Sequence, residues 1–301
     1  MKNKILIAGG TGFIGYHLAK KFLKRKFEVT SLSLSKPKKE RYLKNVKYLY
    51  CDISNLKSLK KVLVEEFNYV VNLAGHVDHT NKRKVINSHF IGCKNLVYIF
   101  RKKKIKIFIQ IGSSVEYGRK NSPQNEKKKI KLNSIQSNYG KAKLMSTNYL
   151  LNLYKKKKFP VIILRLYLIY GAKQDKNRLV PIVINSCLKN KKFPCSIGTQ
   201  KRDFLHVDDL ISLFIKIINS KKNYFGNIFN VGFGKPFSVK KVILLIKKIS
   251  NGGYPEFGKI AFRKDEILNL YPNINKVKNY FNWKPKTSLK NGLVSLIKNG
   301  R

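Results

Sequence analysis

The chain has 301 residues, enough to bury a substantial core as one large domain or two smaller ones. Lys and Arg number 64 against 15 Asp and Glu, a formal net charge of +49, but the cations are scattered and no nucleic-acid module accompanies them, so we expect no nucleic-acid partner. The cysteine spacing fits neither a metal site nor a disulfide, so we expect no bound metal. No apolar run can span a bilayer or act as a signal peptide, so we expect a cytoplasmic protein without a membrane partner.

Short apolar runs alternate with helix-like stretches through the first half of the chain. The runs read KILIAG, FEVTSLSL, VKYLYCDI, YVVNLAG, IKIFIQIGS and PVIILRLYLIYG. Nearly continuous apolar strands separated by helices predict a parallel sheet covered on both faces. Residues 119–129 have no apolar periodicity and are predicted to form a polar loop. After Gly171 the pattern changes, and helices are predicted over VPIVINSCLKN and SVKKVILLIKKIS, the second with Ser238 as N-cap.

The first predicted strand ends in a glycine-rich turn, GxxGxxG. Residues without a Cβ let the backbone bend sharply and approach phosphate, and the N-terminus of the following helix then faces a dinucleotide pyrophosphate. A plain strand-to-helix turn is the alternative, but the strand-turn-helix context favours a cofactor site. The residues expected to contact the cofactor here are Gly9, Gly12, Phe13, Ile14 and Gly15.

The second strand indicates which dinucleotide is bound. NAD binding calls for an acid at the end of this strand, to pair with the adenosine ribose diol. Residues 31–35 read SLSLS and basic residues follow, so Ser33 and Lys36 are expected to accommodate the extra phosphate of NADP. These lysines can equally belong to the general surplus, which leaves NAD possible.

The third strand ends in Asp52 and Ile53, which are placed to meet the adenine. Asp52 could equally be the N-cap of a helix that begins near Leu56, and Ser54 competes for that role.

Tyr139 and Lys143 lie four residues apart on one helix face. In a partly desolvated cleft the ammonium favours the phenolate, which brings the pKa of the tyrosine nearer the working pH. A YxxxK pair arises easily by chance in a lysine-rich chain. Here, however, the pair follows an ordered series of motifs, each at a predicted strand end or on the next helix. These are the glycine turn, Asp52, NLAG at 72–75 and GSSVEYG at 112–118. Chance assembly of that order is improbable.

With these motifs the chain resembles, over essentially its whole length, the extended short-chain dehydrogenase/reductases of the NAD-dependent epimerase/dehydratase family, which act on nucleotide sugars. The resemblance implies that Tyr139 is the acid/base, that Lys143 lowers its pKa and holds the nicotinamide ribose, and that Ser113 hydrogen-bonds the reacting oxygen. It also implies a homodimer. The residues implied to line the cofactor after the fourth strand are Leu73, Ala74 and Gly75.

The resemblance extends to the substrate-binding half. RDFLHVDDL matches a family motif whose arginine, here Arg202, binds the nucleotide diphosphate, and FRKDE supplies Arg263 as a second contact. Ser114 is expected to contact substrate beside Ser113. The segment PEFGKIAFRKDEI together with NWKPK most resembles CDP-abequose synthase and similar 4-keto sugar reductases.

Three departures from the family pattern bear on the reaction. Ser114 and Val115 stand where the dehydratases carry adjacent Asp and Glu, so the elimination of water lacks its carboxylates. Leu168 and Ala172 replace the Asn and Pro of RxxNxYGP, and His89 stands where an Asn normally precedes the GxxNL helix.

These features predict an α/β fold: a Rossmann-type doubly wound parallel sheet at 1–170, to which about 205–232 returns, and a smaller C-terminal α/β substrate-binding lobe at 171–301. The expected function is an NAD(P)-dependent oxidoreductase that reduces a 4-keto-deoxysugar nucleotide, with Tyr139 as proton donor. The alternatives are an NAD-dependent nucleotide-sugar 4-epimerase, a non-catalytic dinucleotide-binding sensor and a nucleic-acid binder. His76 and His79 follow the fourth strand near the expected nicotinamide end, so either could touch substrate, but a structural role is expected for both, as it is for His17 and His206.

Overall fold

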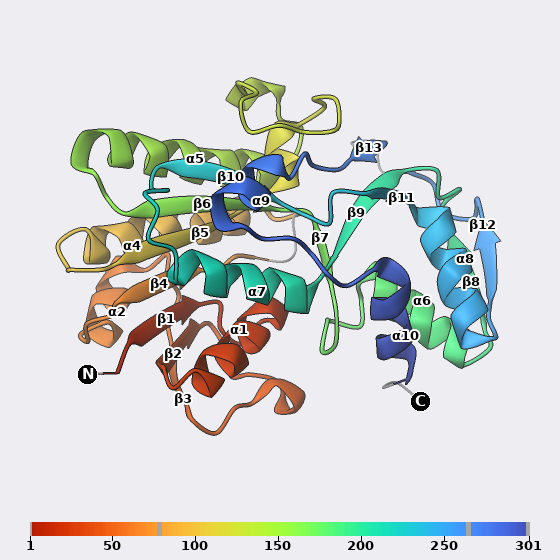
Figure 1. Cartoon of the computed structure of the whole chain (residues 1–301), viewed down its shortest axis with the longest axis horizontal. Helices are drawn as coiled ribbons and strands as arrows, with labels where there is room; N and C mark the ends of the chain where they lie inside the picture. The colour runs from red at the N-terminus through yellow and green to blue at the C-terminus, as the bar shows by residue number, and fades with distance from the viewer. Residues whose placement is uncertain (1, 77–79, 263–265, 299–301) are drawn as a thin grey trace. The chain divides into compact units, whose positions relative to one another are not determined.

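The computed structural model describes residues 2–76, 80–262 and 266–298 (Figure 1). The chain divides into two compact units. Unit 1 comprises Met1–Gly118, Lys129–Arg165 and Ile217–Phe229, and unit 2 comprises Arg119–Lys128, Leu166–Lys216 and Asn230–Arg301. The cofactor and substrate domains expected from the sequence are a functional division, and they stay a prediction.

Unit 1 is built on a seven-stranded sheet in the order β10-β6-β5-β4-β1-β2-β3. The pairs β1–β2, β1–β4, β2–β3 and β4–β5 run parallel. From β1 the chain adds β2 and β3 on one side and then β4, β5 and β6 on the other, as in dinucleotide-binding folds. This strand order confirms the predicted α/β Rossmann-type architecture. The strands are β1 (Lys4–Ala8), β2 (Glu28–Ser33), β3 (Val46–Tyr50), β4 (Tyr69–Asn72), β5 (Ile107–Ser113), β6 (Val161–Leu166) and β10 (Asn227–Val231).

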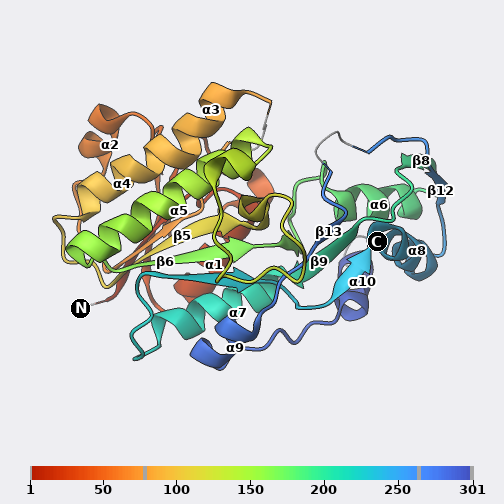
Figure 2. The ribbon, with the colours of Figure 1, turned by 90° about the horizontal axis from the view of Figure 1, so that it is seen from above.

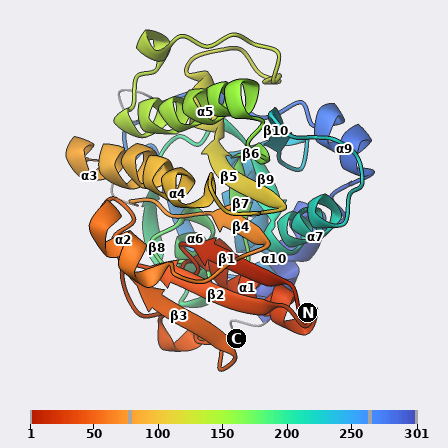
Figure 3. The ribbon, with the colours of Figure 1, turned by 90° about the vertical axis from the view of Figure 1, so that its left-hand side faces the viewer.

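The apolar strands of this sheet are buried because helices cover both of its faces. In Figure 3, α2, α4 and α5 lie on one face and α1 lies on the other, and Figure 2 shows α4 and α5 side by side along the sheet. Leu6, Val70 and Phe108, on three neighbouring strands, belong to one core cluster and are 0% exposed. The helices are α1 (Phe13–Lys24), α2 (Leu56–Val62), α3 (Lys82–Ile86), the π-helix Asn87–Ile91, α4 (Gly92–Phe100) and α5 (Asn138–Lys157), with 3-10 turns at Lys39–Arg41, Ser114–Tyr117 and Leu132–Ser134.

Unit 2 has a second core of its own. Its main sheet has the order β11-β9-β13, with β7 also paired to β9, and β8 pairs with β12. Helix α8 packs on both α6 and α10, and Ser238 caps α8 as predicted, by accepting a hydrogen bond from the backbone N–H of Lys241. The elements are β7 (Leu168–Tyr170), α6 (Leu179–Leu188), β8 (Lys192–Cys195), β9 (Lys201–His206), α7 (Val207–Ile218), β11 (Pro236–Ser238), α8 (Val239–Ser250), β12 (Tyr254–Phe257), β13 (Asn269–Leu270), α9 (Asn275–Phe281) and α10 (Leu289–Lys298).

Two segments differ from the sequence pattern. The apolar run PVIILRLYLIYG holds two strands, β6 and β7, which belong to different sheets. The predicted polar loop at 119–129 has no helix or strand, yet Gln124 within it is 0% exposed, because its side-chain oxygen accepts from the Tyr167 hydroxyl at 2.6 Å and its carbonyl accepts from Asn230. Across the described ranges, no helix is both long and apolar enough to cross a membrane.

Candidate functional site

The glycine turn forms a backbone cradle at the end of β1. Gly9 has φ +82°, and a Cβ there would lie 2.9 Å from the backbone of both Leu73 and Ala74, which follow β4. A Cβ on Gly15 would lie 2.4 Å from the Gly9 carbonyl oxygen, so α1 begins tightly against the turn. Gly12 is the N-cap of α1 and has no side chain to cap it. A cradle that side chains would fill, beside an uncapped helix N-terminus, fits a dinucleotide pyrophosphate.

The end of β2 is joined to this cradle. The Ser33 hydroxyl accepts a hydrogen bond from the Thr11 backbone N–H at 3.2 Å, which leaves its own proton available to donate. Ser31 lies beneath the turn, where a Cβ on Gly10 would come within 2.3 Å of its hydroxyl oxygen. Lys36 is exposed in the loop that follows.

The end of β3 is fixed by α4. The Asn95 side chain donates to the carbonyls of Ile53 and Ser54, both at 2.9 Å, and a Cβ on Gly92 would meet Ile53 at 2.4 Å. Asp52 is exposed, and its carboxylate accepts from the Ser54 backbone N–H at 2.8 Å.

The N-cap of α2 is neither of the two residues considered from the sequence. It is Asn55, whose side chain accepts from the Ser58 backbone N–H at 3.0 Å, and neither Asp52 nor Ser54 has that role.

The segment after β4 contacts an imidazole. Gly75 lies so close to His89 that a Cβ would fall 1.9 Å from the ring. His89 is 5% exposed, its Nε2 lies 3.2 Å from the His76 carbonyl oxygen, and its ring meets the Tyr139 ring edge-on at 5.0 Å between centroids. The π-helix that carries His89 is a distortion often found at functional sites. His79 lies outside the described residues.

Ser113, Tyr139 and Lys143 are all brought together in unit 1. Ser113 ends β5, and its hydroxyl accepts from the Val115 backbone N–H at 3.5 Å. Tyr139 lies half-buried in the first turn of α5, which Ser137 caps. The Lys143 ammonium lies 5.8 Å from the centre of the Tyr139 ring and donates to the Ile111 carbonyl at 2.7 Å.

Lys143 is buried strongly enough to change its ionisation. Its side chain is 3% exposed. Burial lowers its pKa from 10.5 to about 8, against the opposing effect of the nearby Glu116 carboxylate. The lysine therefore keeps most of its positive charge at neutral pH, at close range to the tyrosine ring.

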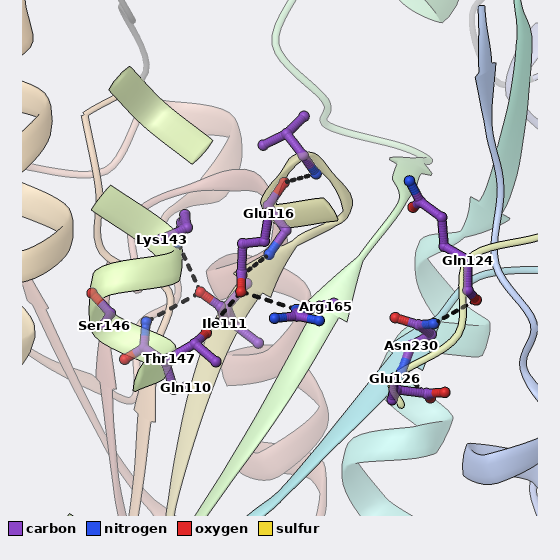
Figure 4. A network of polar contacts seen from close by, with 12 residues as sticks. Gln110, Ile111, Glu116, Gln124, Glu126, Lys143, Ser146, Thr147, Arg165 and Asn230 are labelled. Carbon is purple, nitrogen blue, oxygen red and sulfur yellow. Dashed lines mark hydrogen bonds and ion pairs between the residues drawn. The ribbon is translucent and has the colours of Figure 1, made fainter. Parts of the chain in front are cut away.

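Glu116 is a residue of this site that the sequence analysis did not identify. It is 0% exposed, and Figure 4 shows its carboxylate between Thr147 of α5 and Arg165 of β6. One oxygen accepts from the Ser113 backbone N–H at 2.8 Å, and the other accepts from the Thr147 hydroxyl at 2.8 Å and the Arg165 Nε at 2.9 Å. Two sequence signals pointed to this arrangement: S-x-x-E from Ser113 to Glu116 is a capping box, and an arginine inside an apolar strand needs a buried partner.

Arg202 lies in β9 of unit 2. Its guanidinium pairs with Glu266 and donates to the Lys201 carbonyl at 2.8 Å, and its side chain is 14% exposed. Arg263, expected as the second diphosphate contact, lies outside the described residues. Ser114, the other expected substrate contact, lies in the 3-10 turn after β5 of unit 1 and is 5% exposed.

Two acids of RDFLHVDDL, Asp203 and Asp209, hold loops of unit 2. The Asp203 carboxylate accepts from the backbone N–H groups of residues 233–235, two of them at 2.6 Å. Burial raises the pKa of Asp203 to about 6 against these hydrogen bonds. Asp209 accepts from the N–H groups of Lys286 and Thr287, which fastens the NWKPKTS stretch. His206 packs edge-on against Tyr170 at 5.3 Å between ring centroids.

Comparison with known proteins places this geometry in a family. Residues 5–232 match the model of the NAD dependent epimerase/dehydratase family. The chain is 31% identical over 258 residues to dTDP-D-glucose 4,6-dehydratase of Dictyostelium discoideum, a match that covers 76% of this chain and 58% of that protein. It is 25% identical over 312 residues to CDP-abequose synthase of Salmonella muenchen, with 99% of this chain and 98% of that protein covered.

A solved structure of a nucleotide-sugar enzyme has a similar fold. UDP-glucuronic acid 4-epimerase from Bacillus cereus, in complex with UDP-glucuronic acid and NAD, has a TM-score of 0.87 and 25% identity to this chain, with 99% of this chain and 100% of that one covered. The family match spans more than half of the chain and includes the glycine turn, Ser113, Tyr139 and Lys143. The chain therefore belongs to the NAD-dependent epimerase/dehydratase family.

Proposed function

We propose that the protein reduces a 4-keto-deoxysugar nucleotide with hydride from NADPH. The observation that carries the proposal is that Ser113, Tyr139 and Lys143 lie together in unit 1, while Glu116, the sole carboxylate of GSSVEYG, is committed to the Ser113 N–H, Thr147 and Arg165. Dehydration needs an acid and a base that Ser114 and Val115 cannot supply. A nucleoside-diphosphate sugar is the substrate class because CDP-abequose, dTDP-D-glucose and UDP-glucuronic acid appear in the names of the three relatives.

The residues divide the chemistry between them. When bound, the nicotinamide supplies the hydride that goes to the carbonyl carbon. Tyr139 gives its phenolic proton to the carbonyl oxygen, so the ketone becomes a secondary alcohol. Ser113 donates a hydrogen bond to the same oxygen and polarises the carbonyl. Lys143 stabilises the tyrosinate that remains until a proton returns from solvent.

In this proposal Gly9, Gly12 and Gly15 would hold the pyrophosphate of the cofactor. Asp52 and Ile53 would meet its adenine, and the stretch Leu73–Gly75 would line the cofactor after β4. Ser33 and Lys36 take the extra phosphate, because no acid stands at residues 31–35 to pair with a free ribose diol. Fluorescence titration with both reduced dinucleotides tests this choice, and tighter binding of NADH than of NADPH would refute it.

The substrate diphosphate is assigned to Arg202 and Arg263, and the lobe at 171–301 is proposed to bind the nucleotide sugar while 1–170 binds the cofactor. This division predicts that Arg202→Ala leaves NADPH affinity unchanged. The proposed homodimer is tested by light scattering during gel filtration.

An NAD-dependent 4-epimerase is the second candidate, and the likeness to the Bacillus cereus epimerase over nearly the whole of both chains favours it. Tyr139, Ser113 and Lys143 would serve both reactions. A panel of nucleotide sugars and 4-keto intermediates, followed by mass spectrometry and nicotinamide absorbance, separates the two. A reductase consumes NADPH in step with product, whereas an epimerase interconverts sugars with no net change in absorbance. Cofactor binding without any turnover would instead indicate a sensor.

A further inference from the structure

A buried ion pair adjoins Ser113, one of the candidate catalytic residues. Glu116 is 0% exposed and Arg165 is 2% exposed, and their ion pair spans 2.9 Å (Figure 4). Moving both charges out of water is so unfavourable that a well-packed apolar pair would often serve stability as well or better. Stability alone therefore does not explain why a charged pair is buried here, which points to a role that apolar side chains could not have.

The contacts of Glu116 connect the parts of the site that must act together. Its Oε1 accepts from the backbone N–H of Ser113, the residue expected to polarise the carbonyl. Its Oε2 accepts from Thr147, which lies one helical turn after Lys143 on the same face of α5. Arg165 completes the arrangement from β6. One carboxylate thus links the end of β5 to the helix that carries Tyr139 and Lys143.

Glu116 also acts on Lys143 through its charge. The groups that face the ammonium are the Glu116 carboxylate, the Cys93 thiol, the Tyr139 ring and the Ile111 carbonyl. Burial raises the pKa of Cys93 to about 12, so this thiol stays neutral. The negative charge of Glu116 opposes the effect of burial on Lys143 and helps it to remain protonated.

We propose that Glu116 is a positioning residue of the reaction: it sets the place of Ser113 relative to α5 and supplies the counter-charge that keeps Lys143 cationic. The inference rests on the proposed function, because turnover is its main readout. Arg165 and Thr147 act through Glu116, and none of these residues needs to touch substrate or cofactor.

Two single variants separate position from charge. Glu116→Gln removes the charge and misaligns the hydrogen bonds, so kcat should fall roughly 10- to 100-fold with little change in KM. Since turnover needs the protonated lysine, the alkaline limb of the kcat profile should also move to lower pH. Thr147→Val breaks only the link to α5, so kcat should fall less and the alkaline limb should stay in place. Asn148→Ala, at an exposed neighbouring position, is the matched control and should change neither.

A double variant guards against misfolding. Glu116→Gln alone leaves Arg165 buried and unpaired, whereas Glu116→Gln with Arg165→Met removes both charges. The double variant should unfold at nearly the wild-type temperature and still show the low kcat and shifted limb. If it folds and turns over at the wild-type rate with an unshifted limb, Glu116 is merely structural and the inference is wrong.

The inference can fail independently of the proposed function. If the wild type turns over no member of the panel, the proposed function fails, and ultraviolet titration of the Tyr139 phenol, taken as the difference from Tyr139→Phe, decides the inference alone. The midpoint of that titration should rise in Glu116→Gln, because a less charged Lys143 stabilises the phenolate less. An unchanged midpoint would overturn the inference.

Discussion

The burial of Lys143 should make the protein less stable at neutral pH than it would be with an apolar residue there. Its pKa is about 8 in the folded chain against 10.5 for the ordinary side chain, and its side chain is 3% exposed. Since the unfolded chain binds the proton more tightly, folding is penalised by about 3 kcal/mol at pH 7. The penalty is fully present below the folded pKa, shrinks as pH rises from 8 toward 10.5, and disappears above that range.

Lys143→Met keeps the length of the side chain and removes the charge. It also removes the hydrogen bond to the Ile111 carbonyl, which costs roughly 1 to 2 kcal/mol when that buried oxygen is left unpaired. The variant should therefore be more stable than the wild type by roughly 1 to 2 kcal/mol at pH 7. That advantage should shrink by about 1 kcal/mol between pH 7 and pH 9. Turnover should be almost abolished, and cofactor binding should weaken.

Urea unfolding of both proteins at the two pH values measures this difference. Lys156→Met, on the exposed part of the same helix, is the matched control and should show no comparable pH-dependent gain. A stability difference between Lys143→Met and the wild type that is the same at both pH values would refute the reasoning, because the penalty could not then come from the desolvated ammonium.

Three further substitutions test the site. Gly9→Ala should destabilise the protein by roughly 2 to 4 kcal/mol in thermal unfolding, because a positive φ is combined with a backbone clash. Gly258→Ala, with φ +86° and open space around it, should cost only about 1 to 2 kcal/mol. Equal costs would contradict the close approach of the segments that follow β1 and β4. Tyr139→Phe should lower turnover by roughly two to four orders of magnitude, and near-normal turnover would remove Tyr139 as the acid. Arg202→Ala should raise KM roughly tenfold or more with little change in kcat, and an unaltered KM at physiological salt would mean that Arg202 has only a structural role.

The sheet could be predicted because its signals are local. Each apolar run reports its own burial, and the glycine turn reports its own backbone requirement at Gly9. The N-cap of α8 at Ser238 was equally readable. The cap of α2 was not, since Asp52, Ser54 and Asn55 are all good capping residues and only the folded turn selects the last of them.

Pairings between distant residues could not be predicted from pattern alone. Glu116 and Arg165 are 49 residues apart, and Arg202 and Glu266 are 64 apart, so each residue carries only the hint that it needs a partner. The burial of Gln124 has the same cause, because its partners Tyr167 and Asn230 come from other parts of the chain. The roles assigned to Tyr139, Lys143, Ser113 and the cofactor contacts stay predictions until the variants are measured.

The way the chain is threaded through its two units limits how the protein can be divided. Unit 1 is assembled from three separate stretches, so no single cut releases it as a continuous polypeptide. A protein truncated after Arg165 would keep the glycine turn, Tyr139 and Lys143 but would lose β10, the strand beside β6. That edge would then expose unpaired backbone groups, which favours aggregation. A minimal fragment that keeps the whole sheet of unit 1 would need residues 217–231, which include all of β10, supplied as a separate peptide or rejoined to the end of β6.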